Sequence, residues 1–202
     1  MAREDQAHPG DAPAAPTASA GAPLTMVRPH LRDIPWVPFP AGYGIRPMRA
    51  DEGALWLAVV RDAEKDSAMP DGAFEPQHNG DLASVPERCF LAVEAQGLAV
   101  GTISAWYYTF QVREYGLIHW VAVRPAHQGR GVGRAEVSFA LRRLARWHDQ
   151  ALLNTQSRRL RAVQLYLDFG FVPFLDLPGA VETWRSVRDE LQHPVLQGLT
   201  LG

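Results

Sequence analysis

The order of the predicted elements indicates an α/β (α+β) protein built on a mixed sheet. Three observations support this class. Strands dominate the first half of the folded part, the second half alternates strand, helix, strand, helix and strand, and no internal repeat is visible. The 202 residues suffice for one domain with a full hydrophobic core, or for a domain plus an extension.

The N-terminal region has the composition of an unfolded segment. Residues 1–25 are Ala, Pro, Gly, Ser and Thr with scattered charges, which bury too little apolar surface to order a chain, so we expect a disordered tail. Residues 26–41 are expected to form an extended proline-rich arm, because the alternate prolines of 36–40 forbid a helix. A single domain then spans 42–202.

The first strand and helix of this domain are predicted between 42 and 65. Residues 42–48 predict a strand, and Asp51 can cap a helix that runs to about 65. Its expected buried stripe consists of Leu55, Ala58 and Val59.

A long loop and three strands are expected next. The stretch 67–86 is rich in Gly, Pro, Asp and Asn and predicts a loop with room for one short helix. Segments 89–94 and 98–107 predict a hairpin, and 116–123 predicts a further strand.

Two amphipathic helices and two strands are predicted in the second half. Apolar residues spaced by three and four indicate helices over 133–148 and 158–169, with arginines on the solvent side of the first. Strands are expected at 151–154 and 171–175. The last segment, 181–191, reads as a helix.

Composition excludes several classes of protein. No apolar run is long enough to cross a bilayer and no secretory signal is recognisable, so we expect a cytoplasmic protein without membrane partners. The single cysteine, Cys89, cannot form an internal disulfide and is expected to be a small buried residue.

Charge is distributed unevenly along the chain. Residues 51–94 carry ten acidic residues against three basic ones, and 124–161 carry nine arginines against two acidic residues, although the net charge is only −2. This asymmetry suggests that one half meets an anion and the other a cation, or else that two solvated faces differ in sign.

Three glycines at alternate positions punctuate the segment between the strand at 116–123 and the following helix. Gly129, Gly131 and Gly133 remove the Cβ atoms that would block a ligand, and the helix behind them offers unpaired N–H groups. Such a loop can bind a phosphate or pyrophosphate, although a tight structural turn is the alternative. The sequence lacks the Lys of a P-loop after its last glycine, and it lacks GxGxxG spacing with a later acidic residue.

Two motifs resemble the GCN5-related N-acetyltransferase (GNAT) superfamily. Val121-Ala122-Val123-Arg124-Pro125 followed by Gln128-Gly129-Arg130-Gly131-Val132-Gly133 resembles its acyl-coenzyme A signature. The stretch from Ala162 to Phe171, AVQLYLDFGF, resembles the second signature. The resemblance covers about 117–174 and implies a mostly antiparallel central sheet flanked by helices.

The resemblance also implies which residues bind the coenzyme. Main-chain groups of Val121 and Val123 would pair with the pantetheine arm. Asn154 would contact that arm, or it only forms the turn at the end of a strand. Arg159 occupies a position where family members often have Asn, so the contact made by that Asn is not expected here. N–H groups of the loop would hold the pyrophosphate, with two arginines as counter-charges; these residues are Gln128, Gly129, Arg130, Gly131, Val132, Gly133 and Arg134.

Candidate catalytic groups follow from the same resemblance. Tyr166 would protonate the departing thiolate, with a merely packed tyrosine as the alternative. By strand alternation His119 is expected on the face of Val121 and Val123, where it could take the amine proton; ordered water is the other candidate, and Glu114 and Tyr115 are reserves. His127 is expected to be a surface or coenzyme contact.

The implied activity is transfer of an acetyl group from acetyl-CoA, without a metal, to a primary amine of a small molecule or peptide. A catalytically silent acyl-CoA-binding or regulatory module is the alternative, and a nucleic-acid reader is disfavoured. The acidic segment 62–81 could line the site of a cationic or aromatic amine acceptor together with three aromatic residues, Trp106, Tyr107 and Tyr108. Alternatively, the segment is a solvated loop and the aromatic residues belong to the core. The strand that the family has after its second signature is hard to find in this sequence. The acceptor side is therefore expected to be completed in another way or by a second subunit of a homodimer.

Overall fold

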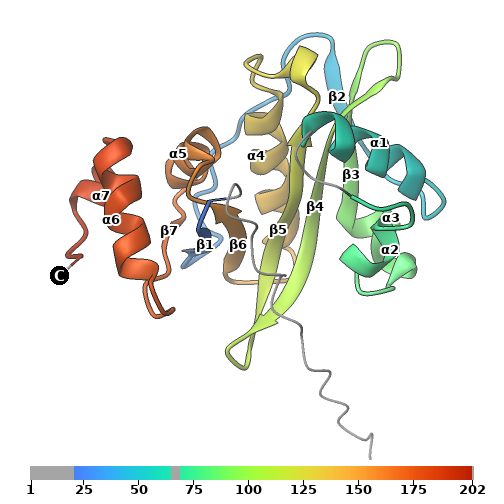
Figure 1. The fold of residues 1–202 in the computed structure, drawn as a ribbon. Coiled ribbons are helices and arrows are strands. Elements are labelled where there is room, and N and C mark those ends of the chain that lie inside the picture. The colour runs from blue at the N-terminus through green and yellow to red at the C-terminus, as the bar shows by residue number, and fades with distance from the viewer. Residues whose placement is uncertain (1–20, 65–68, 202) are drawn as a thin grey trace, which may run out of the picture.

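A computed structural model describes residues 21–64 and 69–201, and the predicted tail up to residue 20 lies outside this range. Seven strands form one sheet in the order β2-β3-β4-β5-β6-β1-β7 (Figure 1). The strands are β1 (Pro23–Arg28), β2 (Tyr43–Pro47), β3 (Cys89–Glu94), β4 (Ala99–Phe110), β5 (Arg113–Val123), β6 (Ala151–Gln156) and β7 (Val172–Pro173). The helices are α1 (Gly53–Ala63), α2 (Phe74–Gln77), η1 (Leu82–Ser84), α3 (Val85–Arg88), η2 (Pro125–His127), α4 (Val132–Leu144), α5 (Leu160–Asp168), α6 (Ala180–Glu190) and α7 (Pro194–Gln197).

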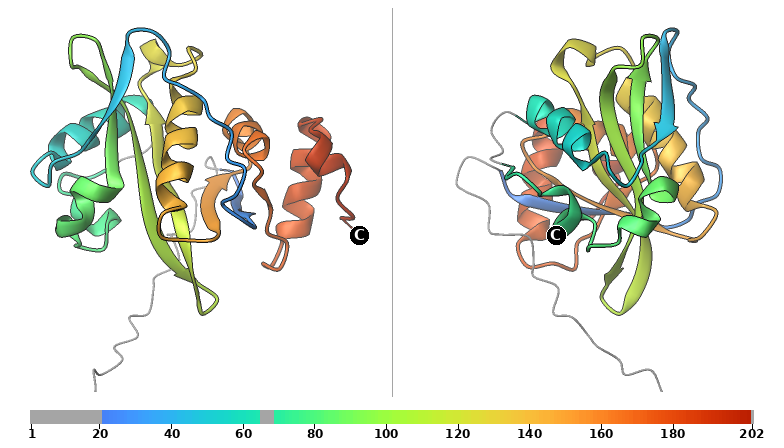
Figure 2. Two further views of the ribbon diagram at one scale, coloured as in Figure 1. Left: turned by 180° about the vertical axis from the view of Figure 1, so that it is seen from behind. Right: turned by 90° about the vertical axis from the view of Figure 1, so that its right-hand side faces the viewer.

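The predicted fold class is confirmed. Every neighbouring pair of strands is antiparallel except β5 and β6, which are parallel. One core lies between the sheet and α4, α5 and α6, and another lies between the sheet and α1, α2 and α3 (Figure 2). The sheet is therefore mixed, mostly antiparallel and covered by helices on both faces.

Strand β1 departs from the sequence prediction. It begins at Pro23, inside the predicted tail, and forms six pairs with β6 and two with β7. Leu24 and Met26 alternate with more exposed residues and are buried in the core, so their contact with the helices outweighs the unfavourable composition around them. β1 therefore occupies the place between β6 and β7, and the segment that was predicted to be helical rather than a final strand is helix α6.

The arm that follows β1 lies against α4. The N–H of Val37 donates to Ser138 Oγ at 2.9 Å, and that hydroxyl donates to the Pro35 carbonyl at 2.7 Å. Ser138 is fully buried on α4, so the arm covers part of that helix.

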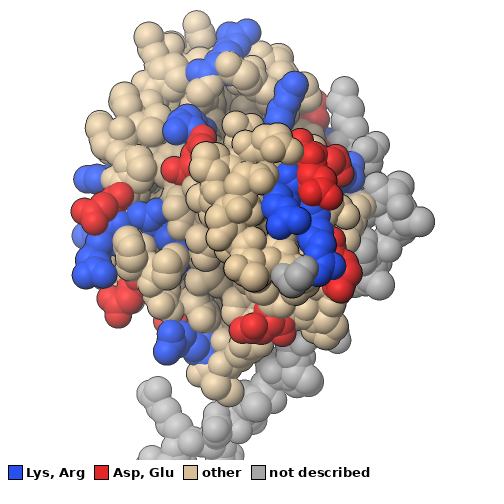
Figure 3. Space-filling model, turned by 90° about the vertical axis from the view of Figure 1, so that its left-hand side faces the viewer, with Lys and Arg blue, Asp and Glu red and all other residues tan. Residues whose placement is uncertain are grey.

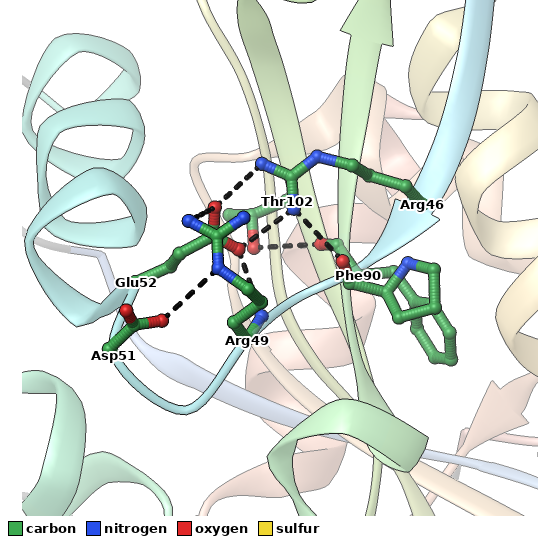
Figure 4. Close-up of polar contacts among 7 residues, drawn as sticks. Arg46, Arg49, Asp51, Glu52, Phe90 and Thr102 are labelled. Atoms are coloured by element: carbon green, nitrogen blue, oxygen red, sulfur yellow. Dashed lines mark hydrogen bonds and ion pairs between the residues drawn. The ribbon is translucent and has the colours of Figure 1, made fainter.

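Helix α1 begins differently from the prediction. Its N-cap residue is Glu52 rather than Asp51, and its buried residues are Trp56, Leu57, Val59 and Val60. Of the predicted stripe, Val59 is buried, Leu55 is partly buried against the same core, and only Ala58 is exposed. Figure 4 shows why Glu52 faces inward: its carboxylate accepts two hydrogen bonds from Arg46, at 2.8 Å each. These bonds lower the pKa of Glu52 to about 2.

The predicted loop 67–86 contains more structure than expected, since α2, η1 and the start of α3 lie within it. Strand β4 also runs past the predicted end to Phe110, and β5 starts at Arg113. The turn between them, Gln111 and Val112, has positive φ at both residues without a glycine, so its usual signal is absent from the sequence. Within the described residues no helix is both long and apolar enough to span a bilayer.

Candidate active site

A β-bulge interrupts the middle of β5. Thr102 of β4 lies opposite Ala122 and Ser104 lies opposite His119, so Ile103 faces two residues of β5. One of these, Trp120, has a φ of 49°. The bulge shifts the alternation of side chains along the rest of the strand.

The bulge places His119 on a different face from the one predicted. Val121 packs into the core beneath α4, and Val123 packs with Val132 at the start of α4. His119 instead contacts the rings of His78 and Trp120 on the side of α1 and α2. The expectation that His119 shares a face with the two valines is wrong, because the extra residue reverses the alternation between them.

Beyond the bulge, β5 has separated from β6. Their parallel ladder has two pairs, Gly116 with Ala151 and Leu117 with Leu152, although β5 continues to Val123 and β6 to Gln156. The edges of both strands past this point are therefore not bonded to each other. A ligand with an extended amide-containing chain can insert between them and bond as a strand would.

The loop at the end of β5 has the backbone geometry expected of an anion site. Gly129 and Gly131 have φ values of 73° and 90°, and Gly131 is the N-cap residue of α4 without a side-chain cap. A Cβ atom on Gly129 would meet nothing, and one on Gly131 only Pro40, at 3.5 Å. This open space adjoins the first turn of α4, at the positive end of the helix dipole, where an anion would be stabilised.

Side chains around the loop hold its shape. Gln128 Nε2 donates to the Val123 carbonyl at 2.8 Å, and exposed Arg130 donates to the Tyr43 hydroxyl at 3.2 Å. Tyr43 also lies 3.0 Å from His127 Nδ1. Arg134 is paired with Asp168 of α5 at 2.7 Å, so Arg130 is the more available of the two predicted counter-charges.

Tyr166 is buried on α5 between charged groups. Its side chain is 7% exposed, and no hydrogen-bond partner for its hydroxyl occurs among the described residues. Burial raises the pKa of Tyr166. The nearby Arg159 lowers this pKa, and Glu136 and Glu64 raise it further. Burial therefore disfavours the phenolate, so the phenol keeps its proton over the physiological range.

Two ion pairs join the acidic and basic segments of the sequence. Asp62 at the end of α1 bonds Arg124 at 2.9 Å, and Glu64 bonds Arg159 through both of its oxygens, at 2.7 and 2.5 Å. On the side of α6 and α7, groups of both signs lie next to each other (Figure 3). At the two ion pairs, the acidic and basic segments neutralise each other across the fold.

His119 is held in its neutral form. Its Nε2 donates to the Gln77 carbonyl at 3.1 Å, and burial, followed by the nearby His78, lowers the pKa of His119 to about 4. The imidazole is therefore uncharged at neutral pH but weakly basic.

His78 is a site residue that the sequence reading missed. It is fully buried, its Nδ1–H donates to the Phe74 carbonyl at 2.8 Å, and its Nε2 lies 3.2 Å from Ser104 Oγ. Burial lowers the pKa of His78. Cys89 lies 3.3 Å from the same serine oxygen and is buried as predicted. His78 falls in a stretch without periodicity, so only the fold brings it to the bulge.

Glu136 was also missed. It is fully buried on α4, both carboxylate oxygens have no partner among the described residues, and burial raises its pKa well above the ordinary value. Gly101 makes room for it, because a Cβ there would lie 2.4 Å from Glu136 Oε1. Burial beneath the sheet therefore disfavours the charged form of this side chain.

The remaining predicted residues are spread over the sheet. Asn154 is exposed on β6 and accepts a hydrogen bond from Thr25. Glu114 lies 3.4 Å from His148, and Tyr115 packs against Phe110 near the hairpin tip, so neither reserve base is at the bulge. Of the proposed acceptor wall, Trp106 belongs to the core. The described residues contain no group of three or more His, Cys, Asp or Glu arranged to hold a metal ion.

The fold is a mixed α/β sheet in which two parallel strands separate beside a glycine-rich loop at the start of a helix. In a comparison with known sequences, the profile described as "Acetyltransferase (GNAT) family" matches residues 29–171. The chain belongs to the GNAT acetyltransferase family.

Individual relatives support the same assignment. A mycothiol acetyltransferase of Streptomyces bingchenggensis is 33% identical over 77% of this chain, and the chain spans 51% of that relative. A GCN5-related N-acetyltransferase from Sphaerobacter thermophilus superposes with a TM-score of 0.55 at 23% identity, over 75% of this chain and 48% of the other. A chain of the NatC complex bound to Gag peptide and CoA superposes with a TM-score of 0.53 at 20% identity. The match covers 64% of this chain and 84% of the NatC chain. The two structures show a shared fold.

Proposed function

We propose that this protein transfers an acetyl group from acetyl-CoA to a primary amine of a small molecule or peptide, by direct attack within a ternary complex. The observation that carries the proposal is the early end of the β5–β6 ladder, together with the N-terminus of α4, which has no side-chain cap, and the buried Tyr166 of α5.

The residues present fit coenzyme A as a co-substrate. N–H groups from Gln128 to Gly133 would hold the pyrophosphate with Arg130, and the main chain of Val121 and Val123 would bond the pantetheine arm. Asn154 on β6 would contact the arm from the other strand. Bound there, acetyl-CoA would supply the thioester that the amine attacks.

The protein's own groups would then handle two protons. Main-chain N–H groups at the bulge, near Trp120 and Val121, would polarise the thioester carbonyl. As the C–N bond forms and the C–S bond breaks, Tyr166 would give its proton to the thiolate. His119 would accept the amine proton directly or pass it to ordered water, and its low pKa favours the water route.

The direct test measures free thiol released from acetyl-CoA in the presence of a panel of small-molecule and peptide amines. Turnover with at least one amine is expected, and calorimetry should detect binding of coenzyme A to the protein alone. If no coenzyme A species binds, the proposal fails.

One observation favours a second candidate, a catalytically silent acyl-CoA-binding or regulatory module. Among the described residues beside the bulge, both histidines have lowered pKa values, which leaves no strong base there. Tight acetyl-CoA binding without turnover on any amine would support this candidate.

A further inference from the structure

Strand β1 supports the part of β6 that β5 leaves unsupported. The β5–β6 ladder ends at Leu152, whereas β1 pairs with β6 along its whole length, from Ala151 to Gln156. Past Leu152, the ladder that fixes the position of β6 is therefore the one with β1. The beginning of β1 is held as well, because the N–H of Ala22 donates to Ser157 Oγ at 3.0 Å.

One side-chain contact links β1 to the predicted coenzyme site. Thr25 lies directly opposite Asn154 in the β1–β6 ladder, and its hydroxyl donates to Asn154 Oδ1 at 2.8 Å. With its oxygen occupied in this way, the Asn154 carboxamide has both N–H groups available for another acceptor. Asn154 itself is exposed.

The two residues stand on the face of the sheet that carries His119. Val27 and Leu152, two positions away along the same strands, pack with Leu117 in the core beneath α1. Alternation puts Thr25 and Asn154 on that same side, next to the separated edges of β5 and β6. The neighbouring pair, Leu24 with Thr155, faces the opposite core.

We infer that Thr25 is a positioning residue for acyl-coenzyme A. Its hydroxyl fixes the Asn154 carboxamide so that an N–H can donate to an amide carbonyl of the pantetheine arm. An unfixed carboxamide would have to lose rotational freedom when the ligand binds, at a cost in affinity. This inference rests on the proposed function, and it gives β1 a part in ligand binding in addition to its part in the sheet.

The test compares Thr25→Val, Asn154→Ala and the double variant by calorimetry with two probes. Coenzyme A carries the arm, and 3′-phosphoadenosine 5′-diphosphate carries the pyrophosphate without it. Valine keeps the shape of threonine, so the fold should be retained. We expect each single variant to weaken coenzyme A binding about three- to tenfold and leave binding of the nucleotide unchanged.

The double variant should bind coenzyme A no more weakly than Asn154→Ala, because Thr25 acts through that side chain. Thr155→Val is the matched control, since it removes the hydroxyl of the next residue on β6, and it should leave both affinities unchanged. Equal weakening of both probes by Thr25→Val would indicate a purely structural role and overturn the inference. So would unchanged coenzyme A binding or fully additive effects, whereas failure of the unmodified protein to bind coenzyme A would instead refute the proposed function.

Discussion

Glu64 and Arg159 form a two-point ion pair that joins the C-terminal end of α1 to the N-terminal end of α5, with nitrogen-to-oxygen distances of 2.7 and 2.5 Å. Arg159 occupies a position where similar proteins often have Asn, and here its guanidinium is committed to a carboxylate. The pair lies close enough to Tyr166 for both charges to act on its phenol. It therefore couples the placement of α1 to the electrostatics of the candidate proton donor.

Removing this pair should cost a modest amount of stability. Arg159→Ala is expected to lower the free energy of unfolding by about 0.5–1.5 kcal/mol, because the pair is bidentate but partly exposed. Urea denaturation measures the change, and Arg161→Ala, an exposed arginine on the same helix, is the control. An equal loss in both variants would mean that the pair contributes nothing specific.

Replacing Tyr166 by Phe should remove the proton donor and little else. We expect kcat to fall about 100-fold or more, while coenzyme A affinity and the fold are retained, because only a hydroxyl without a described partner is lost. Steady-state kinetics with calorimetry separates the two effects. Tyr115→Phe is the control, because this residue lies near the hairpin tip, and it should keep full turnover. Undiminished turnover of Tyr166→Phe would exclude Tyr166 from the mechanism.

Glu136 should make the protein less stable as the pH rises. Its folded pKa is raised, so between the unfolded value of about 4.5 and the folded value the native state binds more protons than the unfolded state. Stability should fall through this range by up to about 1.4 kcal/mol per pH unit. Urea denaturation of Glu136→Gln at several pH values should show this slope removed, and Glu136→Leu should be more stable than the unmodified protein at neutral pH. Parallel pH profiles for all three would contradict the assignment.

Gly131 should be needed for coenzyme A binding as well as for the turn. Gly131→Ala places a Cβ in the open space of the proposed pyrophosphate loop and strains a φ of 90°, so coenzyme A affinity should fall about tenfold or more. Gly179→Ala has the same kind of backbone strain, at a φ of 74°, at the start of α6. It should lose comparable stability, about 1 kcal/mol, without a change in calorimetric affinity. Loss of binding in both would point to a general folding defect.

His119 should remain neutral down to unusually low pH. Histidine NMR should give a titration midpoint near 4, since burial and His78 both disfavour its charged form. Because the unfolded value is about 6.5, its contribution to stability should be lost as the pH falls from about 6.5 towards 4. His119→Gln should remove that part of the acid sensitivity. A midpoint near 6.5 would show that the imidazole is solvated and basic enough to act directly as a general base.

The shape of the glycine-rich loop and the helix that carries Tyr166 could be predicted from local sequence. Glycines at 129, 131 and 133 act through their own backbone, and the apolar spacing around Tyr166 forms its helix whatever lies elsewhere. Because these features depend only on neighbouring residues in the chain, they can be predicted without knowledge of the fold.

Other features depend on contacts between segments far apart in the chain, and only the tertiary structure decides them. Strand β1 becomes ordered because β6 and β7 supply its hydrogen bonds, although its composition resembles a tail. The side on which His119 lies depends on a bulge that pairing with β4 creates, and Glu64 meets Arg159 only after α1 has packed on the sheet. In each case the stabilising energy comes from a partner that the local sequence does not contain.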